Sequence, residues 1–288
     1  MKIVVGVDWR DQSQSALQEV LDLYEPNELT LVHAVNLGRL ESYPLAPLMD
    51  KEPYQEFERA KQRLMDEDGQ QLKEIAVRVQ HDVPSVKQVC EPGTPASVIL
   101  QAIESTAADL VVVGKRGLSQ FAEFAMGSVS QIVLLYAACS TLVVKGAPKK
   151  LQRVIVAVKG PDDAERIKTW LLAHPFTHRL ELVVLNAVPA PLFEPFQGEQ
   201  GTNAWTKAAV AAAQRFVEPI VAALNGPHYA ATGQIVIGDA ADMVAREVGL
   251  SDLLVVSTHG RKGVHRFLFG SVSHSLVHRV PGSVLVVR

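Results

Sequence analysis

The sequence predicts an α/β protein of two tandem doubly wound domains, each a five-stranded parallel sheet (order 3-2-1-4-5) flanked by helices. The chain of 288 residues is long enough for about two domains. Short β-branched runs alternate with helical stretches, which is typical of right-handed βαβ crossovers and a parallel sheet. A glycine-rich stretch also occurs twice, so that Gly117 and Gly127 are matched by Gly260 and Gly270.

The first half contains five short runs rich in β-branched residues, the pattern of strands buried on both faces. These runs are KIVVGV, LTLVHAV, VKQVC, DLVVVG and TLVVK. Helices are expected between them, over residues 15–24, 54–79, 95–105 and 128–137.

The second half repeats the pattern with VIVAV, LELVVLNAV, ATGQIVIG, DLLVV and SVLVV, and with an alanine-rich helix over residues 204–224. The halves align most tightly at their C-terminal ends, where Ser283 stands opposite Ser140. The joint is expected in GAPKKLQ, which combines glycine, proline and charge. We therefore predict domains at residues 1–147 and 151–288.

Composition narrows the class of protein. A net charge of -3 provides no general attraction to nucleic acid, and 48% hydrophobic residues are too many for a disordered chain. The opening MKIVVGVDWRD meets an aspartate after a short apolar run, so we expect no signal peptide, no membrane span and a cytoplasmic location. Cys90 and Cys139 lack metal-site spacing and are expected to be buried small side chains.

The glycine stretch follows a predicted strand that ends at Gly114. Ligands of open parallel sheets bind beyond the carboxyl ends of the strands. If Ser128 caps the next helix, its hydroxyl, the free N–H groups and the helix dipole together form an anion site, most naturally for phosphate. The alternative is a structural turn followed by an ordinary cap, and duplication copies turns as faithfully as sites.

The spacing Gly-x-x-Gly, nine residues, Gly-Ser resembles the nucleotide-binding signature of the universal stress protein family. Further resemblance lies in VVGVDWRDQSQSAL, LTLVHAV and EPGTPASVILQAIESTAADLVVVGKRG, and it covers nearly the whole chain as two halves. This resemblance implies a tandem member that binds an adenine nucleotide such as ATP, with or without Mg²⁺. In the nucleotide-binding branch an aspartate after the first strand and the second-strand backbone hold adenosine, while the glycine stretch holds ribose and phosphates.

Carried onto this chain, the resemblance implies a nucleotide site in the first half. Its residues are Asp8, Ala34, Gly114, Lys115, Arg116, Gly117, Gly127, Ser128, Val129 and Ser130. Asp8 would accept a hydrogen bond from a ribose hydroxyl or the adenine amino group, Lys115 or Arg116 would screen phosphate charge, and Ser130 would add a hydroxyl toward phosphate. Alternatively, Asp8 only caps the first helix or satisfies a turn amide.

The second half departs from the family pattern twice, because Lys159 replaces the aspartate and Ser257 the first glycine. Lysine cannot accept the hydrogen bond, and serine adds bulk where a backbone should approach the sugar. A degenerate site would retain Gly260, Arg261, Gly270, Ser271 and Ser273. We therefore predict a nucleotide-competent first half and a second half that binds an anion or nothing.

The sequence offers no catalytic residue. GxSxG, HExxH, GxxxxGK[ST] and GxGxxG are all absent. His33 is expected to be a satisfied core histidine, and His274 and His278 a solvated helix face rather than a metal site. ATP hydrolysis should be feeble at most.

Three functions are open: a nucleotide-dependent stress-response signalling module, a nucleotide-free scaffold acting through protein contacts, and a weak ATPase. The family pairs such domains, so the chain is expected to form an intramolecular pseudo-dimer with its two final strands near a shared axis, and homodimers also fit the sequence. The proline-rich residues 42–47 and 189–196 are either lids or irregular connections.

Overall fold

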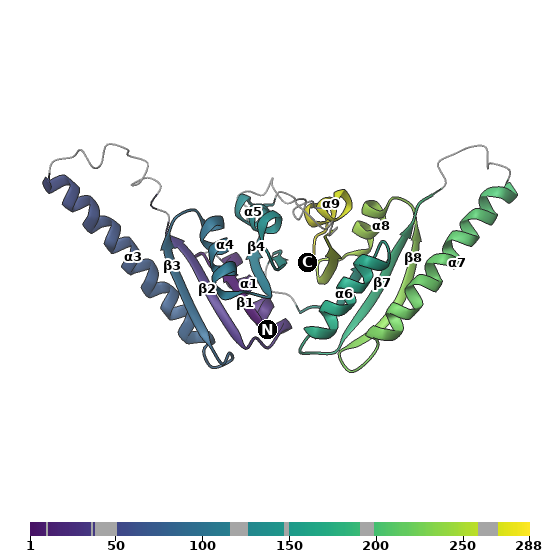
Figure 1. Ribbon diagram of the computed structural model, residues 1–288, viewed down its shortest axis with the longest axis horizontal. Helices are drawn as coiled ribbons and strands as arrows, with labels where there is room; N and C mark the ends of the chain where they lie inside the picture. Colours follow the sequence, from purple (N-terminus) through teal and green to yellow (C-terminus); the bar gives the residue numbers. More distant parts are fainter. Residues whose placement is uncertain are drawn as a thin grey trace.

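The computed structural model describes residues 1–9, 11–35, 37, 51–115, 126–146, 150–190, 199–258 and 270–288. Within these residues the chain forms ten strands and eight helices in two similar halves (Figure 1). The elements of the first half are β1 (Lys2–Gly6), α1 (Asp11–Leu23), β2 (Glu28–Val35), α3 (Lys51–Val79), β3 (Val86–Pro92), α4 (Pro95–Thr106), β4 (Leu110–Gly114), α5 (Ser128–Tyr136) and β5 (Ser140–Val144).

The second half repeats this order of strands and helices. Its elements are β6 (Arg153–Ala157), α6 (Pro161–Ala173), β7 (Leu180–Val188), α7 (Glu199–Leu224), β8 (Tyr229–Ile237), α8 (Ala240–Glu247), β9 (Asp252–Ser257), α9 (Ser271–Arg279) and β10 (Ser283–Val287). All ten predicted strands are confirmed to within a few residues. Helices α1 and α7 begin four or five residues earlier than predicted, because their first turns are polar and carry no apolar period.

The strand order confirms the predicted topology. Strands run β3-β2-β1-β4-β5 in the first half and β8-β7-β6-β9-β10 in the second, and all neighbours within a half are parallel. The two halves join through β5 and β10, which pair antiparallel with Leu142 opposite Leu285. The two final strands therefore lie side by side, and each closes the other's open edge within one ten-stranded sheet.

Helices cover both faces of this sheet. Buried side chains of α1, α3, α6 and α7 pack on one face, and those of α4, α5, α8 and α9 pack on the other. Figure 1 shows α3 and α7 at the two outer flanks. Because alternate strand residues point to opposite faces, each β-branched run contributes to both layers.

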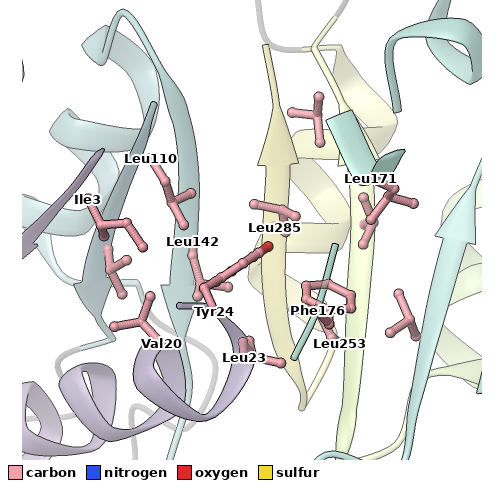
Figure 2. Close-up of a cluster of buried hydrophobic side chains, with 14 of the residues drawn as sticks. Ile3, Val20, Leu23, Tyr24, Leu110, Leu142, Leu171, Phe176, Leu253 and Leu285 are labelled. Atoms are coloured by element: carbon pink, nitrogen blue, oxygen red, sulfur yellow. The ribbon is translucent and has the colours of Figure 1, made fainter. Parts of the chain in front are cut away.

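The hydrophobic core is continuous across the joint. Leu142 and Leu285 lie on the joined strands, with Tyr24 and Phe176 beside them (Figure 2). The Tyr24 and Phe176 rings have centroids 5.2 Å apart, one from each half. We therefore expect the halves to unfold together rather than as independent units.

Two basic residues cross the joint in opposite directions. The Lys145 ammonium donates to the carbonyls of Val277 (2.6 Å) and Val280 (2.7 Å) at the end of α9. The guanidinium of Arg288 donates to the carbonyl of Leu134 in α5. Each half thus supplies a donor for the C-terminal carbonyls of a helix in the other half, which otherwise lack intrahelical partners.

Candidate functional site

A cavity of about 90 Å³ lies at the carboxyl ends of β1, β2 and β4, beside the starts of α4 and α5. Five of the predicted site residues line it: Asp8, Ala34, Gly114, Val129 and Ser130. They come from segments far apart in the sequence, which parallel strand order brings to one edge of the sheet.

The other predicted residues of the first half do not line this cavity or lie outside the described residues. Lys115 follows β4, where its backbone N–H donates to Val144 (2.8 Å). Gly127 and the exposed Ser128 stand at the start of α5. Outside the described residues lie Arg116, Gly117, Gly260, Arg261, residues 42–47 and most of residues 189–196.

The prediction that Ser128 caps α5 is wrong. The cap residue is Gly127, with extended backbone (φ -66, ψ 151), and Ser128 is the first helical residue. A cap side chain bonds the N–H groups two or three residues ahead, so the shift by one residue takes the Ser128 hydroxyl out of that position. The same arrangement recurs in the second half, where Gly270 caps α9 before Ser271.

The role predicted for the Ser130 hydroxyl also needs correction. Ser130 is 1% exposed, and its Oγ donates to the Gly114 carbonyl at 2.8 Å instead of toward a phosphate. Ser273 makes the equivalent bond to Ser257 at 3.2 Å. Each serine therefore ties the start of a helix to the end of a strand, which positions the helix N-terminus beside the cavity.

Replacing Ser130 with alanine should lower the free energy of unfolding by about 1 kcal/mol, because the Gly114 carbonyl loses its hydroxyl donor. Ser273→Ala, the matched variant in the second half, breaks a longer bond and should cost less. Urea unfolding of both variants measures the difference. A larger loss of stability for Ser273→Ala than for Ser130→Ala would contradict this ranking of the two hydrogen bonds.

His33 is a satisfied core histidine, as predicted. Its Nδ1 lies 2.8 Å from the Val7 carbonyl and its Nε2 lies 3.3 Å from Asp68. The Trp9 ring stacks on His33 with centroids 4.2 Å apart, and Trp9 Nε1 donates to Asp68 at 3.0 Å. In the second half Asn186 donates to the Val158 carbonyl at 2.8 Å and takes the place of Nδ1.

The contacts of Trp9 and Asp68 with His33 were not predicted from the sequence. Asp68 is one of many charged residues on α3, so nothing in the sequence distinguished it from a solvated helix face. Only the packing of α3 beside β2 brings its carboxylate to His33.

The second half has the corresponding cavity, with a volume of about 500 Å³. Lys159 and Ser257 line it, together with Gly270, Ser271 and Ser273 from the predicted degenerate site. Smaller side chains contribute to its size, since Ala240 and Val244 stand where the first half has Pro95 and Ile99. The half expected to bind less therefore encloses the larger cavity.

Asp163, which also lines the second cavity, was not identified from the sequence. Its two carboxylate oxygens accept the backbone N–H groups of Lys159 and Gly160, each at 2.8 Å. An aspartate four residues after the substituted position was the available signal. The cavity therefore keeps a carboxylate, although both of its oxygens hold the turn before α6.

Other titratable groups lie apart from the two cavities. The His274 and His278 rings are 4.7 Å apart, and burial lowers the pKa of His278. Cys139 is buried as predicted, which raises its pKa to about 12, whereas Cys90 is only partly buried. Across the described ranges, no group of three or more His, Cys, Asp and Glu side chains could hold a metal ion. No described helix combines the length and apolar character needed to cross a bilayer.

Comparisons with known proteins agree with this architecture. A profile of the universal stress protein family matches residues 1–145 and again residues 150–288. A universal stress protein of Mycobacterium tuberculosis is 25% identical over 304 residues, which cover 99% of this chain and 96% of that protein. One from Synechocystis is 27% identical over 150 residues, covering 50% of this chain and 97% of its own. The crystal structure of one from Archaeoglobus fulgidus aligns with a TM-score of 0.58 at 17% identity, over 100% of this chain and 96% of that one.

Proposed function

Because the chain belongs to the universal stress protein family, as a tandem member matched in both halves, we propose that it binds an adenine nucleotide of the ATP type in its first half. Occupancy of that site would make it a stress-response signalling module. The functional units would be residues 1–147 and 151–288.

The observation that carries this proposal is the convergence of Asp8, Ala34 and Gly114 on one cavity. The Asp8 carboxylate offers acceptors for a ribose hydroxyl or the adenine amino group. Ala34 offers its strand backbone, and Gly114 has no Cβ to keep a sugar away from the chain. The start of α5 would face the phosphates, because its cap residue Gly127 has no side chain to occupy the first helix N–H groups.

The size of the cavity sets a condition on this proposal. The described residues enclose about 90 Å³, whereas pockets for drug-sized ligands typically measure roughly 300–1,000 Å³. A bound nucleotide would therefore extend beyond this cavity, with its phosphates and any accompanying Mg²⁺ past the end of β4. His33 is the imidazole of the cavity wall, and both of its ring nitrogens face oxygen atoms of the protein. Because these contacts occupy both nitrogens, the cavity favours nucleotide binding over hydrolysis.

Calorimetric titration of nucleotide-stripped protein with ATP, ADP and AMP tests the proposal. We expect one site per chain, and a loss of about tenfold or more in affinity for Asp8→Ala and for Gly114→Ser. The matched variants Lys159→Ala and Ser257→Gly, at the same positions of the second half, should leave nucleotide affinity unchanged.

Each other outcome has a defined meaning. An effect of Lys159→Ala without an effect of Asp8→Ala would move the nucleotide to the second half. No binding of any nucleotide would support the nucleotide-free scaffold.

A further inference from the structure

One buried hydroxyl distinguishes the second cavity from the first. Ser257 is 4% exposed and lines the cavity, and its Oγ has no hydrogen-bond partner within the described part of the chain. Leaving a buried hydroxyl unpaired costs about 1–3 kcal/mol. Its counterpart in the first half is Gly114, so this hydroxyl is a feature of the second half alone. A ligand in the cavity would supply the missing partner.

Lys159 and a helix N-terminus supply positive groups at this cavity. Lys159 and the first residues of α9 line the cavity. The cap residue of α9 is Gly270, which has no side chain to bind the helix N–H groups. Among the described lining residues Asp163 is the carboxylate, and its oxygens already accept two backbone N–H groups at 2.8 Å. A lysine together with an uncapped helix N-terminus attracts an anionic group.

The walls of the cavity are mainly apolar. They include Ala157, Leu185, Ala240, Val244, Val256 and Leu276. The volume of about 500 Å³ lies within the usual range for small-molecule sites, roughly 300–1,000 Å³, in which apolar walls hold the ligand body and a few polar groups orient it. The body of the ligand should therefore be apolar.

We infer that the second cavity binds an amphipathic organic anion, with an apolar body and one carboxylate or phosphate group. The oxyanion is bound by Lys159, the Ser257 hydroxyl and the first N–H groups of α9, while the apolar walls bury the body. Lysine cannot accept the hydrogen bond of a ribose hydroxyl, so this ligand differs in class from the nucleotide of the first half. The inference stands apart from the proposed nucleotide site.

Titration of the full-length, ligand-stripped protein with decanoate, decyl phosphate and decanol tests this inference by calorimetry. One of the two anions should bind once per chain and at least about tenfold more tightly than the neutral alcohol, which has the same apolar body. The tighter anion distinguishes a carboxylate ligand from a phosphate ligand. Saturating ATP should leave its affinity unchanged.

Two variants examine the anion contacts. Lys159→Met and Ser257→Ala should each weaken binding of the anion several-fold and leave decanol unaffected. Ser257→Ala should not lower the unfolding temperature, because the Ser257 Oγ has no partner to lose in the part of the chain that the structure describes. Lys168→Met is the matched control, since it removes a lysine paired with Glu165 on α6 outside the cavity and should leave anion affinity unchanged.

Equal affinities for decanol and the anions would overturn the inference, and so would unchanged anion affinity in both variants or no binding at all. Competition between ATP and the anion that disappears in Lys159→Met would show that the second cavity takes a nucleotide, which also overturns it. Loss of ATP binding in Asp8→Ala is a separate result. Either site can therefore fail while the other stands.

Discussion

Replacing Asp252 with alanine should lower the free energy of unfolding by about 3 kcal/mol. Asp252 is 5% exposed and accepts from Arg153 Nε with both oxygens at 3.1 Å, and from the Gly249 N–H at 2.7 Å. Removing the carboxylate leaves a partly buried guanidinium without its counter-charge and an amide without its acceptor. An uncompensated charge of this kind is among the most destabilising changes in a protein interior.

The first half contains the matched control. Asp109 occupies the equivalent position before β4, and its carboxylate accepts the Lys2 backbone N–H at 2.7 Å in a more exposed setting. Asp109→Ala should therefore cost about 1 kcal/mol. Urea unfolding of both variants measures the contrast, with Asp252→Asn expected between them because its amide oxygen can still accept from Gly249. Equal losses for the two alanine variants would show that the Arg153 pair adds little.

The stability of the protein should depend on pH through two groups at the joint, with opposite signs. Burial raises the pKa of Glu19 from 4.5 to about 7, opposed by a hydrogen bond with Ser283 and reinforced by Asp22. The folded protein therefore holds the proton more tightly than the unfolded chain. Its stabilising contribution is complete below pH 4.5 and is lost as the pH rises to about 7.

Lys145 acts in the other direction. Burial lowers its pKa from 10.5 to about 7, and the nearby Lys115 adds to the shift. The unfolded chain therefore binds the proton more tightly, and stability rises with pH between about 7 and 10.5. The neutral amine still has two N–H donors for the Val277 and Val280 carbonyls, so deprotonation keeps the contacts of the cap.

Together these groups should produce a minimum in stability near pH 7, with a total change of a few kcal/mol on each side, since one pKa unit corresponds to about 1.4 kcal/mol. Denaturant unfolding measured across this pH range in three proteins checks it. Glu19→Gln should remove the loss of stability between pH 4.5 and about 7, and Lys145→Met should remove the gain between about 7 and 10.5. Profiles of both variants that parallel the wild type would refute the assignment.

Much of the fold could be predicted because the signals are local. Strands buried on both faces must be apolar throughout, so runs such as VIVAV can be recognised without knowing which strands lie beside them. The repeat then implied that each half forms the same unit. The starts of α1 and α7 were missed because polar first turns carry no apolar period.

The candidate site was only partly predictable. Asp8 follows one recognised strand and Gly114 ends another, and the structure brings both to one cavity. Asp163 and Asp68 were missed because their roles depend on which backbone or ring lies opposite them. The Ser130 hydroxyl was assigned to phosphate, but it donates to the Gly114 carbonyl. That bond depends on how α5 packs against β4, which the local sequence does not show.

The sequence by itself determined the tandem α/β architecture and the strand order. It also determined that Lys159 stands in the second half where the first half has Asp8. The architecture follows from local composition and from the duplication, and the strand order from the resemblance to the universal stress protein family. Only the tertiary structure decided that the second cavity is the larger, that the buried Ser257 hydroxyl has no partner among the described residues, and that Lys145 reaches the end of α9. These depend on the side chains that meet across the fold, which spacing along the chain does not specify.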